Sequence, residues 1–165
     1  MRERQVRPVT HVGSTAGRGL KQFFAEEITG PLGADFTIGA ANGHGNARSV
    51  ATIQAAISNG GRVGDTQLLN SDTIARIFER QSNGIDLVLG LPVSFGLGYA
   101  LADPSDAFGV NSGQVCYWGG WGGSIVINDL DHRITMAYMM NRMQAGLVGS
   151  DTSVALYAAL RSILD

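Results

Sequence analysis

Residues 118–124 (WGGWGGS) are the stretch of this sequence whose residue types and spacing best suit chemistry. They lead directly into an apolar, β-branched run. Glycines weaken a strand and often mark a place where a ligand or another backbone comes close. Backbone N–H groups at such an edge can donate hydrogen bonds to an oxyanion. The segment suits a carbonyl substrate lying along a strand, and it equally suits a tight strand entry held by its tryptophans with no ligand.

The sequence offers no recognised nucleophile for such a substrate. No serine stands in a Gly-x-Ser-x-Gly elbow, and no glycine-rich phosphate loop precedes the only lysine, Lys21. Arg18 stands three residues before Lys21, so a Ser-x-x-Lys pair is absent. Cys116 has no predictable histidine partner, and Ser14 has no neighbouring base, so we expect an inert core thiol and a loop serine. We therefore predict no catalytic residue.

The composition excludes several classes of function. The formal net charge is −2 and no basic stripe is visible, so we expect no nucleic-acid partner. His11, His44 and His132 are far apart and there is one cysteine, so we expect neither a metal nor a cofactor. No apolar run is long enough to span a membrane, and no apolar segment follows the N-terminal arginines as in a secretory signal. These features predict a cytoplasmic protein.

Helices come first in the chain and strands come later, and together they must position residues 118–124. Apolar spacing predicts helices over residues 18–29, 46–58, 71–81 and 150–163. Strands are predicted over residues 94–101, 114–118, 122–128 and 134–141. Residues 1–17 show no periodicity and are expected to be irregular, before one domain over residues 18–165. This order predicts an α+β fold, an antiparallel sheet with packed helices that ends in a C-terminal helix.

Local signals predict the ends and faces of these helices. Pro31 is expected to end the first helix by Gly30, because proline cannot continue a helix. Ser71 and Ser150 are the expected N-caps of the third and last helices. The last helix is expected to bury one face, made of Val154, Tyr157, Leu160 and Ile163.

In this order the motifs resemble the C-terminal part of the serine β-lactamase-like family. That family includes class C β-lactamases, penicillin-binding peptidases, carboxylesterases and transesterases. The resemblance covers nearly all of residues 18–164 and rests on four pieces: FFAEEI with PLG at 23–33, NGHGNARSVA at 42–51, GG with LLNS at 60–71, and WGGWGGS with NRM at 118–143. It implies a partial β-lactamase/transpeptidase-like fold and, in intact relatives, a small ester or amide substrate.

The resemblance also implies roles for four residues. Trp118, Gly119 and Gly120 match the esterase-like Trp-Gly-Gly form of the family's third active-site motif. By this analogy Trp121 supplies a backbone N–H to the oxyanion hole, while Gly119 and Gly120 let the substrate lie against the strand. The family's Ser-x-x-Lys and tyrosine motifs have no counterpart here, since no tyrosine has an asparagine two residues on.

Two functions remain open from the sequence. The first is a truncated, esterase-like serine hydrolase remnant, a pseudoenzyme that is inactive alone. The second is a non-catalytic binding or oligomerisation module derived from the same fold. Apolar faces left exposed by an absent subdomain would favour homo-oligomers.

Overall fold

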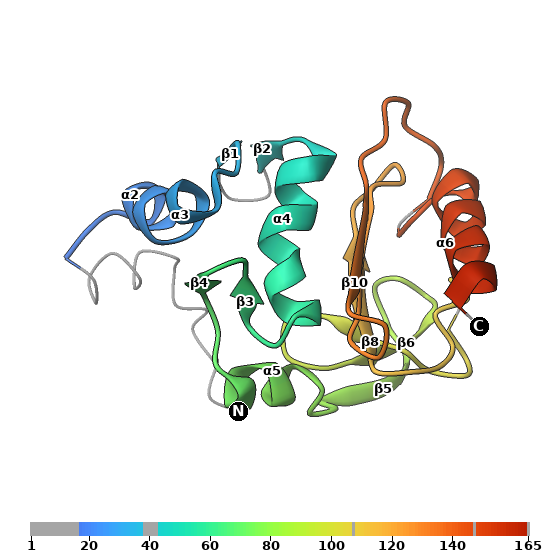
Figure 1. The fold of residues 1–165 in the computed structure, drawn as a ribbon. Helices are drawn as coiled ribbons and strands as arrows, with labels where there is room; N and C mark the ends of the chain where they lie inside the picture. The colour runs from blue at the N-terminus through green and yellow to red at the C-terminus, as the bar shows by residue number, and fades with distance from the viewer. Residues whose placement is uncertain (1–16, 38–42, 107, 147, 165) are drawn as a thin grey trace, which may run out of the picture.

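The computed structural model describes residues 17–37, 43–106, 108–146 and 148–164, so the N-terminal segment predicted to be irregular lies almost wholly outside it. Helices pack on both faces of a six-stranded antiparallel sheet (Figure 1), which confirms the predicted α+β class. The helical elements are α2 (Leu20–Phe24), the π-helix η1 (Ala25–Thr29), α3 (Gly30–Leu32), α4 (Ala47–Ser58), α5 (Ser71–Ile77) and α6 (Asp151–Leu164).

The strands of the main sheet follow one another in the order β10-β9-β8-β7-β6-β5. They are β5 (Ser82–Ile85), β6 (Pro92–Phe95), β7 (Ala100–Leu101), β8 (Val115–Gly119), β9 (Ile125–Asp129) and β10 (Ile134–Tyr138). Two short antiparallel pairs stand apart from this sheet: β1 (Phe36–Thr37) with β2 (His44–Gly45), and β3 (Arg62–Val63) with β4 (Thr66–Gln67). Each strand of the main sheet pairs with its neighbours in the chain, so hairpin connections build it without crossovers.

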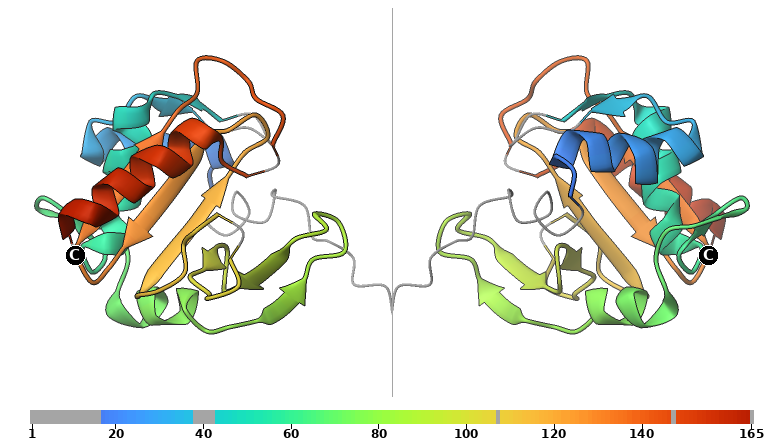
Figure 2. Two further views of the ribbon diagram at one scale, coloured as in Figure 1. Left: turned by 90° about the vertical axis from the view of Figure 1, so that its right-hand side faces the viewer. Right: turned by 90° about the vertical axis from the view of Figure 1, so that its left-hand side faces the viewer.

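The two faces of the sheet are covered by different helices, as Figure 2 shows from opposite sides. Side chains alternate between the faces along each strand, so each face has its own core. The α6 face buries one cluster: Val93, Ala100, Val110, Val115, Tyr117, Ile125, Ile127, Val148 and Tyr157. The face under α4 and α5 buries a second: Ile57, Ile74, Ile77, Leu101 and Cys116. Strand β8 contributes to both clusters, which fixes the position of the residues that follow it.

The first helical segment runs further than its proline predicts. The chain passes from α2 through the π-helix η1 into α3 and ends at Gly33, which takes the left-handed conformation at φ +58°. Pro31 lies in the first turn of α3, where an amide N–H would have no partner inside the helix. The expected end at Gly30 is therefore wrong, because proline here opens a new turn after the π-helix.

Two predicted elements are divided differently in the structure. The run predicted as one strand over residues 94–101 is a hairpin of β6 and β7, closed by a hydrogen bond from the Gly96 N–H to the Tyr99 carbonyl at 2.9 Å. The third helix ends at Ile77, before residue 81, and strand β5 follows it and pairs with β6. Its N-cap is Asn70, one residue before the predicted Ser71, because the Asn70 side chain accepts from the Thr73 N–H at 2.7 Å.

Helix α6 begins as predicted but turns a different face to the sheet. The Ser153 N–H donates to the Ser150 hydroxyl at 3.3 Å, which is the expected cap. Ser153 and Tyr157 are buried, one turn apart. Val154 and Ile163 are 42% and 80% exposed, so their predicted burial is wrong. Because the small Ser153 faces the sheet, the buried face of α6 differs from the apolar face that the sequence predicts.

Candidate functional site

The Trp-Gly-Gly segment lies at the end of strand β8, beyond the residues that pair with β7. Strand β9 pairs with β8 as far as Gly119, whereas β7 reaches only Tyr117 and Cys116. The Ala102 N–H donates to the Val115 carbonyl at 3.0 Å, so the odd-numbered residues of β8 direct their backbone groups towards β7. By the same alternation, the N–H and C=O of Gly119 point past the end of β7. Among the described residues, no strand pairs with this side of Gly119, whereas β9 pairs with its other side.

Some of the backbone N–H groups after Gly119 have hydrogen-bond partners and one does not. The N–H groups of Gly120, Gly122 and Gly123 donate to carbonyl oxygens at 2.8 to 3.3 Å. The N–H of Trp121 has no hydrogen-bond partner within the described part of the chain, and its residue is 71% exposed. This leaves Trp121 as a donor that an added ligand can use.

Gly119 and Gly122 stand at positions where a side chain would be strained. A Cβ on Gly119 would lie 2.8 Å from the Ser124 carbonyl oxygen and 3.0 Å from a Val148 methyl, so a side chain would displace the turn. Gly122 has φ +96°, which side chains rarely adopt. Gly120 differs, because nothing lies within 4 Å of the position of its Cβ. The chain is therefore open at Gly120, next to the unused donor of Trp121.

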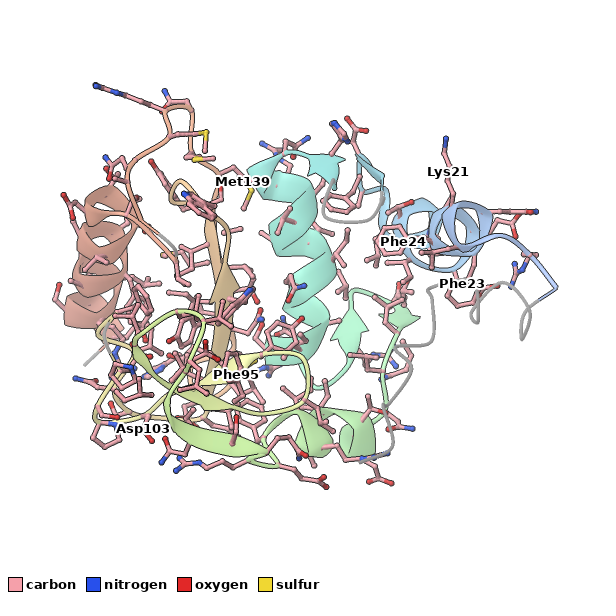
Figure 3. The ribbon with its side chains drawn as sticks, turned by 180° about the vertical axis from the view of Figure 1, so that it is seen from behind. Lys21, Phe23, Phe24, Phe95, Asp103 and Met139 are labelled. Carbon is pink, nitrogen blue, oxygen red and sulfur yellow. The ribbon has the colours of Figure 1, made fainter. Side chains whose placement is uncertain are left out.

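The two tryptophans have different surroundings. Trp118 is partly buried against the core of the α6 face, and its ring centroid lies 5.3 Å from that of Phe95 in a tilted arrangement. Figure 3 labels Phe95 among the strands. Trp121 lies at the surface. Trp118 thus anchors the end of β8, while Trp121 stays accessible to a ligand.

No nucleophile and base meet at this segment in the described residues. Figure 3 shows Lys21 on α2, apart from the sheet and pointing outward. Cys116 is fully buried, and burial raises the pKa of its thiol to about 12, so it is protonated at neutral pH. Ser14 lies outside the described residues.

Within residues 17–37, 43–106, 108–146 and 148–164, no cluster of three or more histidine, cysteine, aspartate or glutamate side chains could hold a metal. None of the helices in the same ranges is both long and apolar enough to cross a bilayer.

The structure contains a network of side-chain hydrogen bonds that the sequence did not predict. On the α4 face, the Tyr99 hydroxyl and the Asn128 amide both donate to the Gln54 side-chain oxygen, at 2.9 and 3.1 Å. The Thr135 hydroxyl donates to the Asn128 oxygen at 2.9 Å and lies 2.8 Å from the Ser58 hydroxyl. A polar Asn128 directly after three β-branched residues was the one sequence signal that could have shown it.

The fold is an antiparallel sheet between helices, with an open glycine-rich end on the inner strand β8. The family model described as Beta-lactamase matches residues 9–159. The chain therefore belongs to the beta-lactamase family.

Solved structures agree on the fold. A family VIII carboxylesterase matches with a TM-score of 0.76 and 23% identity, covering 90% of this chain and 53% of its own. A penicillin-binding protein homolog from Caulobacter crescentus has a TM-score of 0.78 at 24% identity, covering 89% and 54%. EstA from Arthrobacter nitroguajacolicus Rue61a has a TM-score of 0.74 at 21% identity, covering 92% and 55%. The chain thus spans about half the length of these structures. A search among curated proteins found no match.

Proposed function

We propose that this chain forms the oxyanion-strand half of an esterase-like acyl-transfer site. The observation that carries the proposal is the unused Trp121 N–H beside the open edge of β8. In this proposal an ester or amide substrate lies along Gly119 and Gly120. The Trp121 N–H donates to the carbonyl oxygen as negative charge develops on it. Trp118 holds the strand end by packing on Phe95.

The proposed reaction needs parts that these 165 residues do not supply. In acyl transfer a serine oxygen attacks the carbonyl carbon, the C=O π electrons move to oxygen, and the oxyanion is held by two donors. The chain offers one of those donors and has no Ser-x-x-Lys pair. We therefore propose that it is catalytically silent alone, and that activity requires a nucleophile-bearing half.

Labelling with a fluorophosphonate tests the silent state. The intact mass of the folded protein is measured after treatment, beside a thermal melt. We expect no added phosphonyl group. One added group per chain would show an activated nucleophile, and Ser14→Ala and Cys116→Ala variants would identify it.

A chimera tests the role of Trp121 itself. Residues 17–164 replace the matching part of an active family VIII carboxylesterase, and turnover of a 4-nitrophenyl ester is measured. Trp121→Pro removes the N–H and is expected to lower kcat about 10²- to 10³-fold, the usual effect of losing one oxyanion donor. Trp121→Phe keeps the N–H and is the matched control. Equal activity of the two variants would contradict the assignment.

A second function, an oligomerisation module, is favoured by the free edge of β10. Within the described residues nothing pairs with the outer side of this terminal strand, and Ile134–Tyr138 carry no charge that would discourage edge pairing. Nearby, α6 exposes 47% of Leu156 and 80% of Ile163. A two-fold dimer through β10 is the expected species in size exclusion with light scattering. Ala137→Lys should yield a monomer, and a monomeric wild type would exclude this function.

A further inference from the structure

A cavity of about 480 Å³ separates the first helical segment from α4. Its lining is mainly apolar and comes from elements that are distant in sequence: Phe23, Ile28, Ile53, Ile57, Leu69 and Tyr99. Phe23 can be followed on α2 in Figure 3. A hollow of about 240 Å³ shares Ile53 and Gln54 with it. The volume falls in the range of small-molecule sites, and residues 118–121 are not part of it.

Gln54 gives the cavity a side-chain donor whose orientation is fixed by two neighbouring side chains. Gln54 lines the cavity, and its oxygen accepts from both the Tyr99 hydroxyl and the Asn128 amide. The Thr135 hydroxyl donates to the Asn128 oxygen, and the Asn128 amide nitrogen donates to Gln54. The Gln54 oxygen is thus committed to the protein. Its NH₂ group has no hydrogen-bond partner among the described residues.

The charge at the rim restricts the ligand further. Glu27 is part of the lining, and its carboxylate accepts from the Arg18 guanidinium at 2.7 Å on the outer side. A further carboxylate inside an apolar cavity next to Glu27 would lose hydration, and the nearby Arg18 guanidinium is already paired with Glu26 and Glu27. An uncharged acceptor suits the Gln54 NH₂ without this cost.

We propose that this cavity binds an uncharged, mainly hydrocarbon molecule whose carbonyl oxygen accepts from the Gln54 side-chain amide. A medium-chain ketone or ester is the chemical class that fits. The hydrocarbon chain packs against Phe23, Ile53 and Ile57, while the carbonyl satisfies the unused donor. This site is separate from the Trp-Gly-Gly strand, so a test of ligand binding here does not depend on whether the proposed acyl transfer is correct.

The test titrates the folded protein with 2-heptanone, which has no bond for an esterase to cleave, and follows ¹⁵N–¹H shifts of the side-chain amides. We expect saturable shifts with the Gln54 NH₂ among the largest. Gln54→Glu keeps oxygens for Tyr99 and Asn128 but replaces the donor with a charged acceptor, so binding should weaken about tenfold. Gln144→Glu, which places the same charge outside this cavity, should bind as the wild type does.

Other arms of the experiment do not depend on that variant. Hexanoate at neutral pH should bind more weakly than 2-heptanone, because it brings a charge beside Glu27. Ile53→Trp fills the cavity and should abolish binding while a thermal melt shows a folded protein. Absence of saturable shifts in the folded wild type would overturn the proposal. So would equal binding by Gln54→Glu and the wild type, or equal binding of the ketone and hexanoate.

Discussion

The two faces of the central sheet are buried by different chemistry. On the α6 face the buried side chains are mainly apolar, with hydroxyls on Tyr117, Tyr157 and Ser153, and the Tyr117 hydroxyl donates to the Asp106 carboxylate. The α4 face also has an apolar cluster, but polar side chains lie within it. The register aligns one row across five strands, called the polar row for its Ser94, Asn128 and Thr135: Ser94, Leu101, Cys116, Asn128 and Thr135. An apolar face needs only a helix of matching shape, whereas a polar row needs partners at fixed positions. The polar row therefore dictates where α4 lies, through Gln54 and Ser58.

The largest effect is expected on the apolar face. Tyr117 is fully buried, so Tyr117→Ala removes an aromatic ring from the core and should lower the free energy of unfolding by about 3–5 kcal/mol. Urea unfolding followed by circular dichroism measures this. Tyr117→Phe keeps the ring and should cost less. A loss below about 1 kcal/mol for Tyr117→Ala would show that α6 does not seal this face.

Substitutions in the polar row should lower the free energy of unfolding by less, because they remove hydrogen bonds instead of apolar packing. Asn128→Ala removes one of the two partners of the Thr135 hydroxyl and one of the two partners of the Gln54 oxygen, so we expect a loss of about 2 kcal/mol in urea unfolding. Thr135→Val removes one link of the same network and is expected to cost about 1 kcal/mol. If Asn128→Ala is as stable as the wild type, the row does not hold α4.

Alkaline pH should reveal the buried thiol of the polar face. In the unfolded chain Cys116 ionises near its ordinary pKa of about 8.5, but in the folded protein only near about 12. Between these values the folded state keeps a proton that the unfolded state has lost. Stability is therefore unaffected by this thiol at lower pH and falls as pH rises through about 8.5, by at most about 1.4 kcal/mol per pH unit.

The measurement is urea unfolding at pH 7, 8 and 9.5 for the wild type and Cys116→Ala. The variant should lose the decline between pH 8 and 9.5. Burial also raises the pKa values of Tyr99 and Tyr117, so both proteins should share a further decline near pH 10 and above. Identical profiles for both proteins over the whole range would contradict the assignment to Cys116.

The smallest effect is expected at the outer side of α6. Ile163 is 80% exposed, so Ile163→Ser should change the free energy of unfolding by less than about 0.5 kcal/mol. The same variant should reduce self-association in light scattering if the β10 edge and α6 form an interface. A large loss of stability in the monomer would show that Ile163 packs against the fold.

Local sequence signals were enough where an element is decided by its own residues. Helix α4 follows from its apolar spacing, and the structure adds the Asn46 cap, whose side chain accepts from the Ser49 N–H at 2.9 Å. Strands β8, β9 and β10 follow from apolar and β-branched runs. Strand β5 (SNGI) is exposed and shows no alternation, so only its pairing with β6 defines it. The passage through Pro31 depends on a π-helix that no local pattern indicates.

Local sequence signals likewise predict only part of the candidate site. Residues 118–121 could be singled out from their types and from the family resemblance. The resemblance also implied the Trp121 N–H as a donor, but its lack of a partner among the described residues depends on where β7 ends and on which carbonyls the neighbouring glycines reach. The network through Gln54, Tyr99 and Asn128 joins residues far apart in the chain, so only the folded arrangement brings it together.

Helix α6 follows every strand in chain order, and this sets the sequence of events during synthesis. Strands β5 to β10 pair with their chain neighbours, so the sheet can assemble as residues 82–138 leave the ribosome. Its apolar face, with Val115 and Tyr117, stays uncovered until residues 151–164 emerge. Chaperone binding to the nascent chain is therefore expected to peak in that interval, when the strands are paired and one face is still bare.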